Sequence, residues 1–101
     1  MAVGFVAVHY PHPDHHDDFV RRVERAVEVM LPTPGCLAAD GWVTPTGDAV
    51  ISIGKWQSPE AQAASVATAE AAGVDFVYDE REVRPRMILR LVSPPAAARA
   101  A

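Results

Sequence analysis

The side chains best suited to chemistry in this sequence are a histidine and a tryptophan, each at the end of an apolar stretch. His9 lies near the end of residues 3–10, and imidazole is the side chain that most readily moves protons near neutral pH. Trp56 follows Ser52 and Gly54 at alternate positions, and these small neighbours leave space beside the indole ring. We expect a pocket in which His9 and Trp56 are catalytic, as proton acceptor and aromatic wall, and Ser52 contacts substrate. The plainer alternatives are a hydrogen-bonded boundary histidine and a tryptophan that fills the core.

Two further aromatic residues and a row of arginines extend this candidate site. Tyr10 and Trp42 could form further substrate-binding walls, although alternation along a strand turns Tyr10 to the face opposite His9. Arg86 could hold a substrate carboxylate or phenolate, because a guanidinium matches the geometry of such anions. The alternative pairs this arginine and its neighbours with acidic residues or with a partner subunit. The arginines are Arg84, Arg86 and Arg90, and the acidic residues are Asp79, Glu80 and Glu82.

Residues 12–18 contain three histidines and three aspartates, a composition that could bind a metal ion. The adjacent prolines favour a solvated helix start instead, where acidic side chains oppose the positive end of the helix dipole. His15 and His16 would also point about 100° apart on a helix. We expect no dedicated metal site, and we expect Asp14 to cap the helix.

Hydrophobic periodicity predicts two helices and four strands. A helical stripe of apolar residues runs from Phe19 to Leu31 and is stopped by Pro32. Ser58 and Pro59 are typical of the start of a second helix, which is rich in alanine and ends before Gly73. The predicted strands are 3–10, 36–44, 49–57 and 84–92, and a short helical turn is expected within 74–82.

The resulting order, β-α-β-β-α-β, is that of the ferredoxin-like α+β fold. Its four-stranded antiparallel sheet carries both helices on one face. The opposite face would be apolar and bare, and a patch of that size is unfavourable in water. We therefore expect a homodimer in which two sheets pack face to face as a dimeric α+β barrel. Residues 1–93 would form the single domain, and 94–101 a flexible C-terminal tail.

Composition excludes several function classes. The chain has 101 residues, enough for one small domain, and a formal charge of −4, so it has no basic surplus for binding nucleic acid. Its one cysteine, Cys36, excludes an internal disulfide framework and a cysteine-rich zinc site. No apolar run approaches the roughly 18 residues that cross a bilayer. The first residues lack the basic flank and cleavage site of a signal peptide, so we expect no membrane partner and a cytoplasmic location.

Three stretches of the sequence resemble the antibiotic biosynthesis monooxygenase family of dimeric α+β barrels. The first is the opening strand followed by Pro13 and the helix entered at 17–19. The second is the Pro-Gly-Cys-Leu stretch at 34–37. The third and most specific is Lys-Trp-Gln-Ser-Pro-Glu-Ala at 55–61, which looks like the family's W-x-S-x-E-A junction between a strand and a helix. The resemblance covers residues 3–93 in order and spacing.

The resemblance implies a fold and a set of candidate reactions. Members of the family include cofactor-independent monooxygenases that oxidise aromatic polyketides, haem-degrading enzymes and small-metabolite isomerases. Many members carry a histidine in the second helix, whereas residues 62–69 here contain none, which disfavours haem degradation. We therefore expect a cofactor-independent monooxygenase-like enzyme that acts on an aromatic or polycyclic metabolite. The alternative is a non-catalytic small-molecule-binding or scaffold dimer, which the missing histidine favours.

Overall fold

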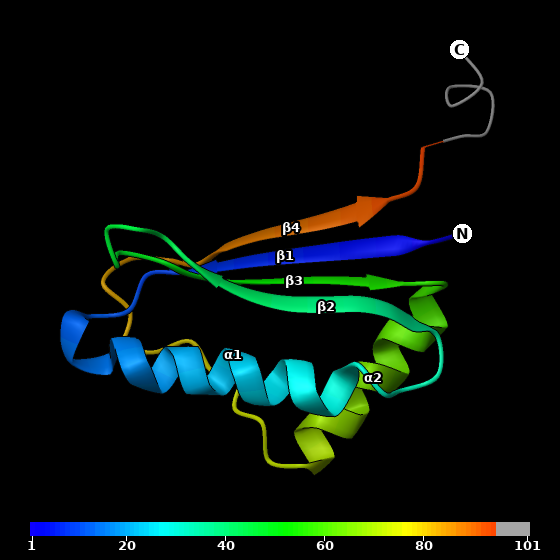
Figure 1. Ribbon diagram of the computed structural model, residues 1–101, viewed down its shortest axis with the longest axis horizontal. Coiled ribbons are helices and arrows are strands. Elements are labelled where there is room, and N and C mark those ends of the chain that lie inside the picture. The colour runs from blue at the N-terminus through cyan, green and yellow to red at the C-terminus, as the bar shows by residue number, and fades with distance from the viewer. Residues whose placement is uncertain (95–101) are drawn as a thin grey trace.

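The computed structural model describes residues 1–94, which form one sheet and two α-helices. All neighbouring strands are antiparallel, in the order β2-β3-β1-β4, and both helices lie on one side of the sheet (Figure 1). The predicted ferredoxin-like α+β fold is therefore confirmed. The elements are β1 (Val3–His9), the 3₁₀ turn η1 (Pro13–His15), α1 (His16–Met30), β2 (Cys36–Val43), β3 (Val50–Trp56), α2 (Pro59–Ala71) and β4 (Met87–Val92).

The strand register decides which side chains face the helices. In β1, Phe5 pairs with Gly54 of β3 on one side and with Arg90 of β4 on the other. Two residues further along, Ala7 pairs with Ser52 and with Ile88. Paired residues share a face of the sheet, so these rows of side chains point toward the helices together.

The helix starts follow the local sequence, with one correction. Ser58 caps α2 by accepting a hydrogen bond from the Ala61 amide, and Pro59 occupies its first turn, as predicted. Asp14, in contrast, does not cap α1. It lies inside η1, which Pro13 opens, so α1 begins only at His16, without a side-chain cap.

The connecting segment, residues 72–86, contains no helix, so the predicted turn within 74–82 was wrong. Asp75 accepts a hydrogen bond from the Val77 amide, and Asp79 accepts one from the Arg81 amide. Such local bonds from aspartate to the backbone compete with helix formation. The backbone of this segment instead bonds to the end of β1, where the Val83 amide donates to the Tyr10 carbonyl.

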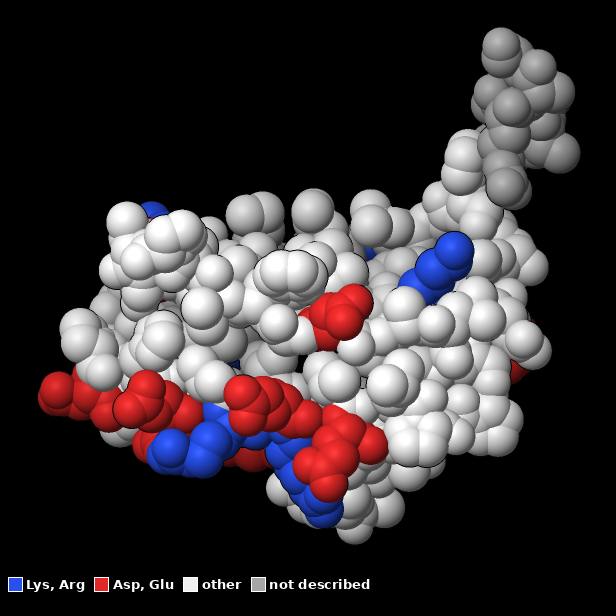
Figure 2. Space-filling model, in the orientation of Figure 1, with Lys and Arg blue, Asp and Glu red and all other residues white. Residues whose placement is uncertain are grey.

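The two faces of the sheet are covered unequally. Helices α1 and α2 pack chiefly on β2 and β3, which leaves space above β1 and β4 on the same side. Figure 2 shows the charged side chains crowded along the helix side of the molecule, whereas the sheet side is mostly uncharged. On that opposite face Met87, Leu89 and Leu91 are each nearly half exposed.

No helix within residues 1–94 is long and apolar enough to span a membrane. Of the predicted C-terminal tail, residues 95–101 lie outside the described part of the chain.

Candidate active site

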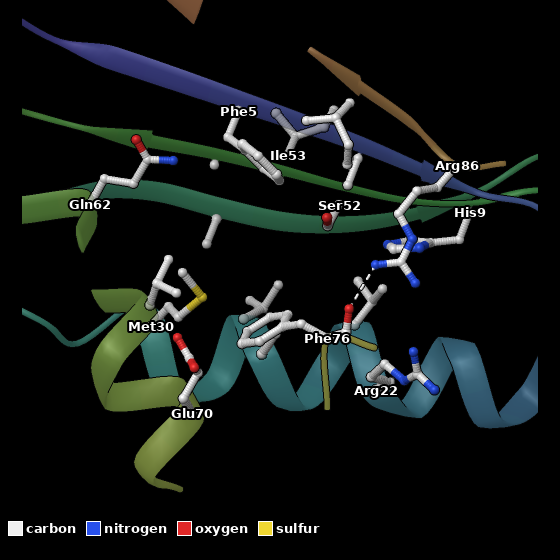
Figure 3. Close-up of a pocket in the computed structure, with 18 of the residues that line it drawn as sticks. Phe5, His9, Arg22, Met30, Ser52, Ile53, Gln62, Glu70, Phe76 and Arg86 are labelled. Carbon is white, nitrogen blue, oxygen red and sulfur yellow. Dashed lines mark hydrogen bonds between the residues drawn. The ribbon is translucent and has the colours of Figure 1, made fainter. Parts of the chain in front are cut away.

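A pocket of about 410 Å³ lies between the sheet and the helices, in the space that α1 and α2 leave above β1 and β4. Its floor is the pair of sheet rows that contain Phe5 and Ala7, and its lining is mostly apolar. The side chains of Ala7 and Ser52 on this floor are small, whereas the space over Gly54 is taken by the Trp56 ring. Phe5 on the sheet and Phe76 on the connecting segment lie between the two ends of the pocket (Figure 3).

One end of the pocket is polar and built around His9. The imidazole is 8% exposed and lies against the Phe19 ring of α1, with ring centres 5.8 Å apart. Its Nδ1 atom is 3.4 Å from Oε1 of Glu82, whose side chain is fully buried. The second carboxylate oxygen of Glu82 accepts a hydrogen bond of 2.6 Å from Nη2 of Arg86. His9, Glu82 and Arg86 therefore form one buried cluster at this end.

This environment favours the neutral form of His9. Burial lowers the pKa of the imidazole, and the positive charge of Arg86 lowers it further. The Glu82 carboxylate opposes both effects without overcoming them. A neutral imidazole can accept a proton, so His9 has the protonation state that a general base needs near neutral pH.

The arginines around the pocket differ in how they are engaged. Arg86 donates to the carbonyls of Phe76 and Val77 as well as to Glu82, so its terminal nitrogens are occupied. Figure 3 shows Arg86 turned toward the Phe76 backbone in this way. Arg90 also lines the pocket, but it has no carboxylate partner within residues 1–94. Its guanidinium lies over the Phe5 ring, 5.5 Å from the ring centre.

Trp56 closes the opposite end of the pocket. Its ring lies over Gly54, where an added Cβ would come within 2.4 Å of the indole. The indole nitrogen donates a hydrogen bond of 2.9 Å to the buried hydroxyl of Ser65 on α2. Because this is the only polar hydrogen of the side chain, Trp56 can offer a ligand its ring surface but no hydrogen bond.

The two other predicted aromatic walls do not line this pocket, so that expectation was wrong. Trp42 pairs with Ile51 of β3, and alternation turns both residues to the sheet face away from the helices. Tyr10 follows His9 at the end of β1, and its ring is stacked under the guanidinium of Arg84 at 3.8 Å. Ser52, in contrast, points into the pocket from β3 (Figure 3).

The histidine-rich stretch forms contacts between neighbours in sequence. His15 approaches Asp18 at 3.8 Å, and His16 approaches Asp17 at 3.6 Å. Within residues 1–94, no group of three or more histidine, cysteine or acidic side chains is arranged to hold a metal ion. Burial raises the pKa of the Cys36 thiol, so this residue stays protonated and weakly nucleophilic.

Phe76 lines the pocket and Glu82 lies beside His9, and the sequence reveals neither position. The sequence suggests Glu82 only as an ion-pair partner of the arginines, because it lies 73 positions from His9. An isolated β-bridge between Pro11 and Glu82 brings the two together. That bridge is a tertiary contact, and no local pattern of residues encodes it.

The family model for antibiotic biosynthesis monooxygenase matches residues 2–73. The chain belongs to this family. The match covers the first helix and the strand–helix junction around Trp56, the region that carries the resemblance in the sequence. No functionally curated protein matches the chain significantly.

Solved structures confirm the family fold. Rv0793 from Mycobacterium tuberculosis has a TM-score of 0.81 at 16% identity, over 94% of this chain and 97% of that one. PA3566 from Pseudomonas aeruginosa has a TM-score of 0.75 at 17% identity, over 93% and 95%. A Nitrosomonas europaea protein named for the family has a TM-score of 0.77 at 13% identity, over 91% and 89%. At such identities the likeness concerns the fold alone.

Proposed function

We propose that this family member is a cofactor-independent monooxygenase-like enzyme that acts on an aromatic or polycyclic small metabolite. The observation that carries the proposal is a buried His9, at the polar end of a mostly apolar pocket of about 410 Å³. Burial and the charge of Arg86 lower the pKa of this imidazole. A pocket of this size holds a drug-sized molecule, and the rings of Phe5, Trp56 and Phe76 can stack on a flat one.

In the proposed reaction the substrate is itself the reductant. His9 removes an acidic proton from a hydroxylated ring system, and the resulting carbanion transfers electrons to O₂. One oxygen atom enters the substrate, where a CH₂ group becomes a carbonyl, and the other leaves as water with the two hydrogens removed. The apolar walls exclude bulk water from the reacting carbanion. No electron from a cofactor is needed to balance this reaction.

The pocket residues take separate parts in this proposal. Trp56 is the aromatic wall, and Ser52 offers a hydroxyl on the floor. The sequence predicts Arg86 to hold a substrate anion, but its terminal nitrogens bond to Glu82 and two carbonyls, and only its buried Nε has no hydrogen-bond partner within residues 1–94. Arg90 is therefore the better candidate for that contact, on the same side of the sheet. Glu70 and Gln62 of α2 border the pocket at the end away from His9 (Figure 3).

Oxygen consumption tests the proposal directly. We expect the purified protein to take up O₂ with a hydroxylated anthrone, at a rate above the spontaneous oxidation. His9→Ala should lower kcat by roughly 10²–10⁴-fold and leave substrate affinity nearly unchanged, as expected for a general base. His12→Ala is the matched control, because His12 is exposed and outside the pocket. Equal rates with and without His9 would contradict its assignment as the base.

The second candidate is a non-catalytic protein of the same fold that binds a small molecule. It is favoured by the side chain of Trp56, whose only donor is already used by Ser65, and by the absence of histidine from α2. Such a protein would bind aromatic ligands with an affinity that depends on the pocket walls, and would leave O₂ untouched. Ligand binding without oxygen consumption across a panel of anthrones and quinols would favour this candidate.

We also propose that the protein is a homodimer formed through the bare sheet face. Met87, Leu89 and Leu91 lie on one face of β4, and the side chains of Val6 and Val8 lie beside them on β1. Apolar surface of this extent is typical of an interaction site. A second copy offers the same surface in return, as a two-fold symmetric interface requires.

A further inference from the structure

Two buried polar atoms face each other at the polar end of the pocket, and neither forms a hydrogen bond within residues 1–94. They are Nδ1 of His9 and Oε1 of Glu82, which are 3.4 Å apart. The Glu82 side chain has no exposed surface at all. Buried polar groups are nearly always bonded, so an unbonded pair of donor and acceptor calls for an explanation.

The position of the carboxylate is fixed by its other contacts. Its Oε2 atom accepts a hydrogen bond from Arg86, and Arg86 also donates hydrogen bonds to the carbonyls of Phe76 and Val77. The backbone of Glu82 pairs with Pro11, two residues beyond the end of β1. Glu82 is thus held beside His9 from two directions, with its free carboxylate oxygen 3.4 Å from Nδ1 of the imidazole.

We propose that Glu82 is a positioning residue that holds the single proton of neutral His9 on Nδ1 and leaves Nε2 as the proton acceptor. An ionised carboxylate can only accept hydrogen bonds, so a neutral imidazole beside it must place its hydrogen on the facing nitrogen. An unconstrained imidazole prefers the opposite arrangement, with the proton on Nε2. The functional part of this inference rests on the proposed function, whereas the proton placement does not.

The charges around His9 explain why one carboxylate matters. Arg86 from the connecting segment and Arg22 from α1 both disfavour a second proton on the ring, whereas Glu82 favours it. When Nε2 takes a proton from substrate, the imidazolium gains the attraction of Glu82. Glu82 therefore supports both the starting tautomer and the protonated product of the step.

The proton placement can be measured on the protein without a substrate. Long-range nitrogen–proton correlation spectra distinguish the two neutral tautomers of each imidazole, at a pH of about 8 where the neutral form predominates. In the wild-type protein we expect His9 to be in the Nδ1–H form. A His9 found in the Nε2–H form would overturn the proposal, whatever any variant does.

Glu82→Gln is the informative variant, because a carboxamide has nearly the same shape. Its oxygen can keep the bond from Arg86 while its NH₂ group donates to Nδ1 of His9, which forces the proton to Nε2. We expect the His9 tautomer to reverse. Glu80→Gln is the matched control, because Glu80 is an exposed neighbour without an ion pair within residues 1–94, and it should leave the tautomer unchanged. A Glu82→Gln spectrum that still shows the Nδ1–H form would contradict the proposal.

Kinetics provide the functional readout. Glu82→Gln should lower kcat by roughly 10²–10⁴-fold with little change in KM, because the base is present in the wrong tautomer. The acidic limb of the kcat/KM profile should also move to lower pH, since the carboxylate that favours protonation is gone. If Glu82 contributed only to stability, neither kcat nor the acidic limb of the kcat/KM profile would change in the folded variant. If the tautomer reverses as expected and no oxygen is consumed by the wild type, the proton placement stands and the proposed function fails.

Discussion

The surroundings of His9 disfavour the charged form of its imidazole. Its pKa is lowered by burial and by Arg86, so the folded protein binds fewer protons near pH 6 than the unfolded chain does. The contribution of His9 to stability is therefore complete above its ordinary pKa of about 6.5 and is lost as the pH falls below it.

The first prediction concerns that pH dependence. Between about pH 7.5 and pH 5, we expect the free energy of unfolding of the wild type to fall more steeply than that of His9→Gln. Urea denaturation at several pH values measures the difference. His12→Gln should follow the wild type, because His12 is exposed and has no ion pair within residues 1–94. Parallel curves for the wild type and His9→Gln would show that the imidazole is not destabilised by its surroundings.

A second residue-scale prediction distinguishes Arg90 of β4, which lines the pocket, from Arg84 of the preceding segment, which does not. Arg90→Gln should weaken binding of an anthracene carboxylate by about 1 kcal/mol, since a bond between charged groups is lost at a partly solvated site. Binding of the matching uncharged alcohol should be nearly unchanged. Arg84→Gln is the control, because Arg84 stacks on Tyr10 outside the pocket. Calorimetric titration that finds equal losses for both ligands would remove the anion contact from the account.

For side chains on one strand, the sequence predicts which of them share a face of the sheet. Alternation places His9 with Phe5, and Trp56 with Ser52, and in the structure both pairs line the pocket on the helix side of the sheet. It cannot place Glu82, because a bridge to Pro11 between distant segments brings that residue in.

Among the elements, β3 both packs the Trp56 ring over Gly54 and lines the pocket. Gly54 leaves room for the Trp56 ring, and an added methyl group would come within 2.4 Å of it. The ring therefore lies flat along the strand and its N–H reaches Ser65.

Gly54→Ala should consequently destabilise the protein by about 1–3 kcal/mol, the usual cost of overpacking a core. In a Trp56→Leu background the same substitution should cost clearly less, because the clashing ring atoms are gone. Thermal or urea unfolding of the four proteins in this cycle gives the coupling. Additive effects would mean that the indole can move aside freely.

Elements that depend on local patterns are the ones that sequence predicts well. The apolar stripe of α1 and the Ser58 cap of α2 are read from neighbours in the chain. The path of the connecting segment, residues 72–86, is not predictable from such local patterns. Asp75 and Asp79 bond to nearby amides, and Tyr10 accepts a bond from Val83, so distant contacts and local turns decide its path.

At the scale of the whole molecule, the bare sheet face predicts the assembly. Light scattering should give a mass of about 22 kDa, twice the 10.8 kDa of the chain, at micromolar concentration. Leu89→Glu should shift the protein toward the monomer, because it places a charge among apolar side chains at the interface. Arg25→Glu, on the exposed side of α1, is the control. A stable wild-type monomer would contradict the proposed dimer.

The central claim is that the pocket uses O₂ to oxidise a flat substrate without a cofactor. The most direct test is to incubate the purified protein with a hydroxylated anthrone under isotope-labelled O₂ in unlabelled water. The mass of the product is then measured by mass spectrometry. The account predicts one heavy oxygen atom in the product, at a yield that falls to the spontaneous level when His9 is replaced by alanine. A product with no heavy oxygen, or equal labelling with and without the protein, would contradict it.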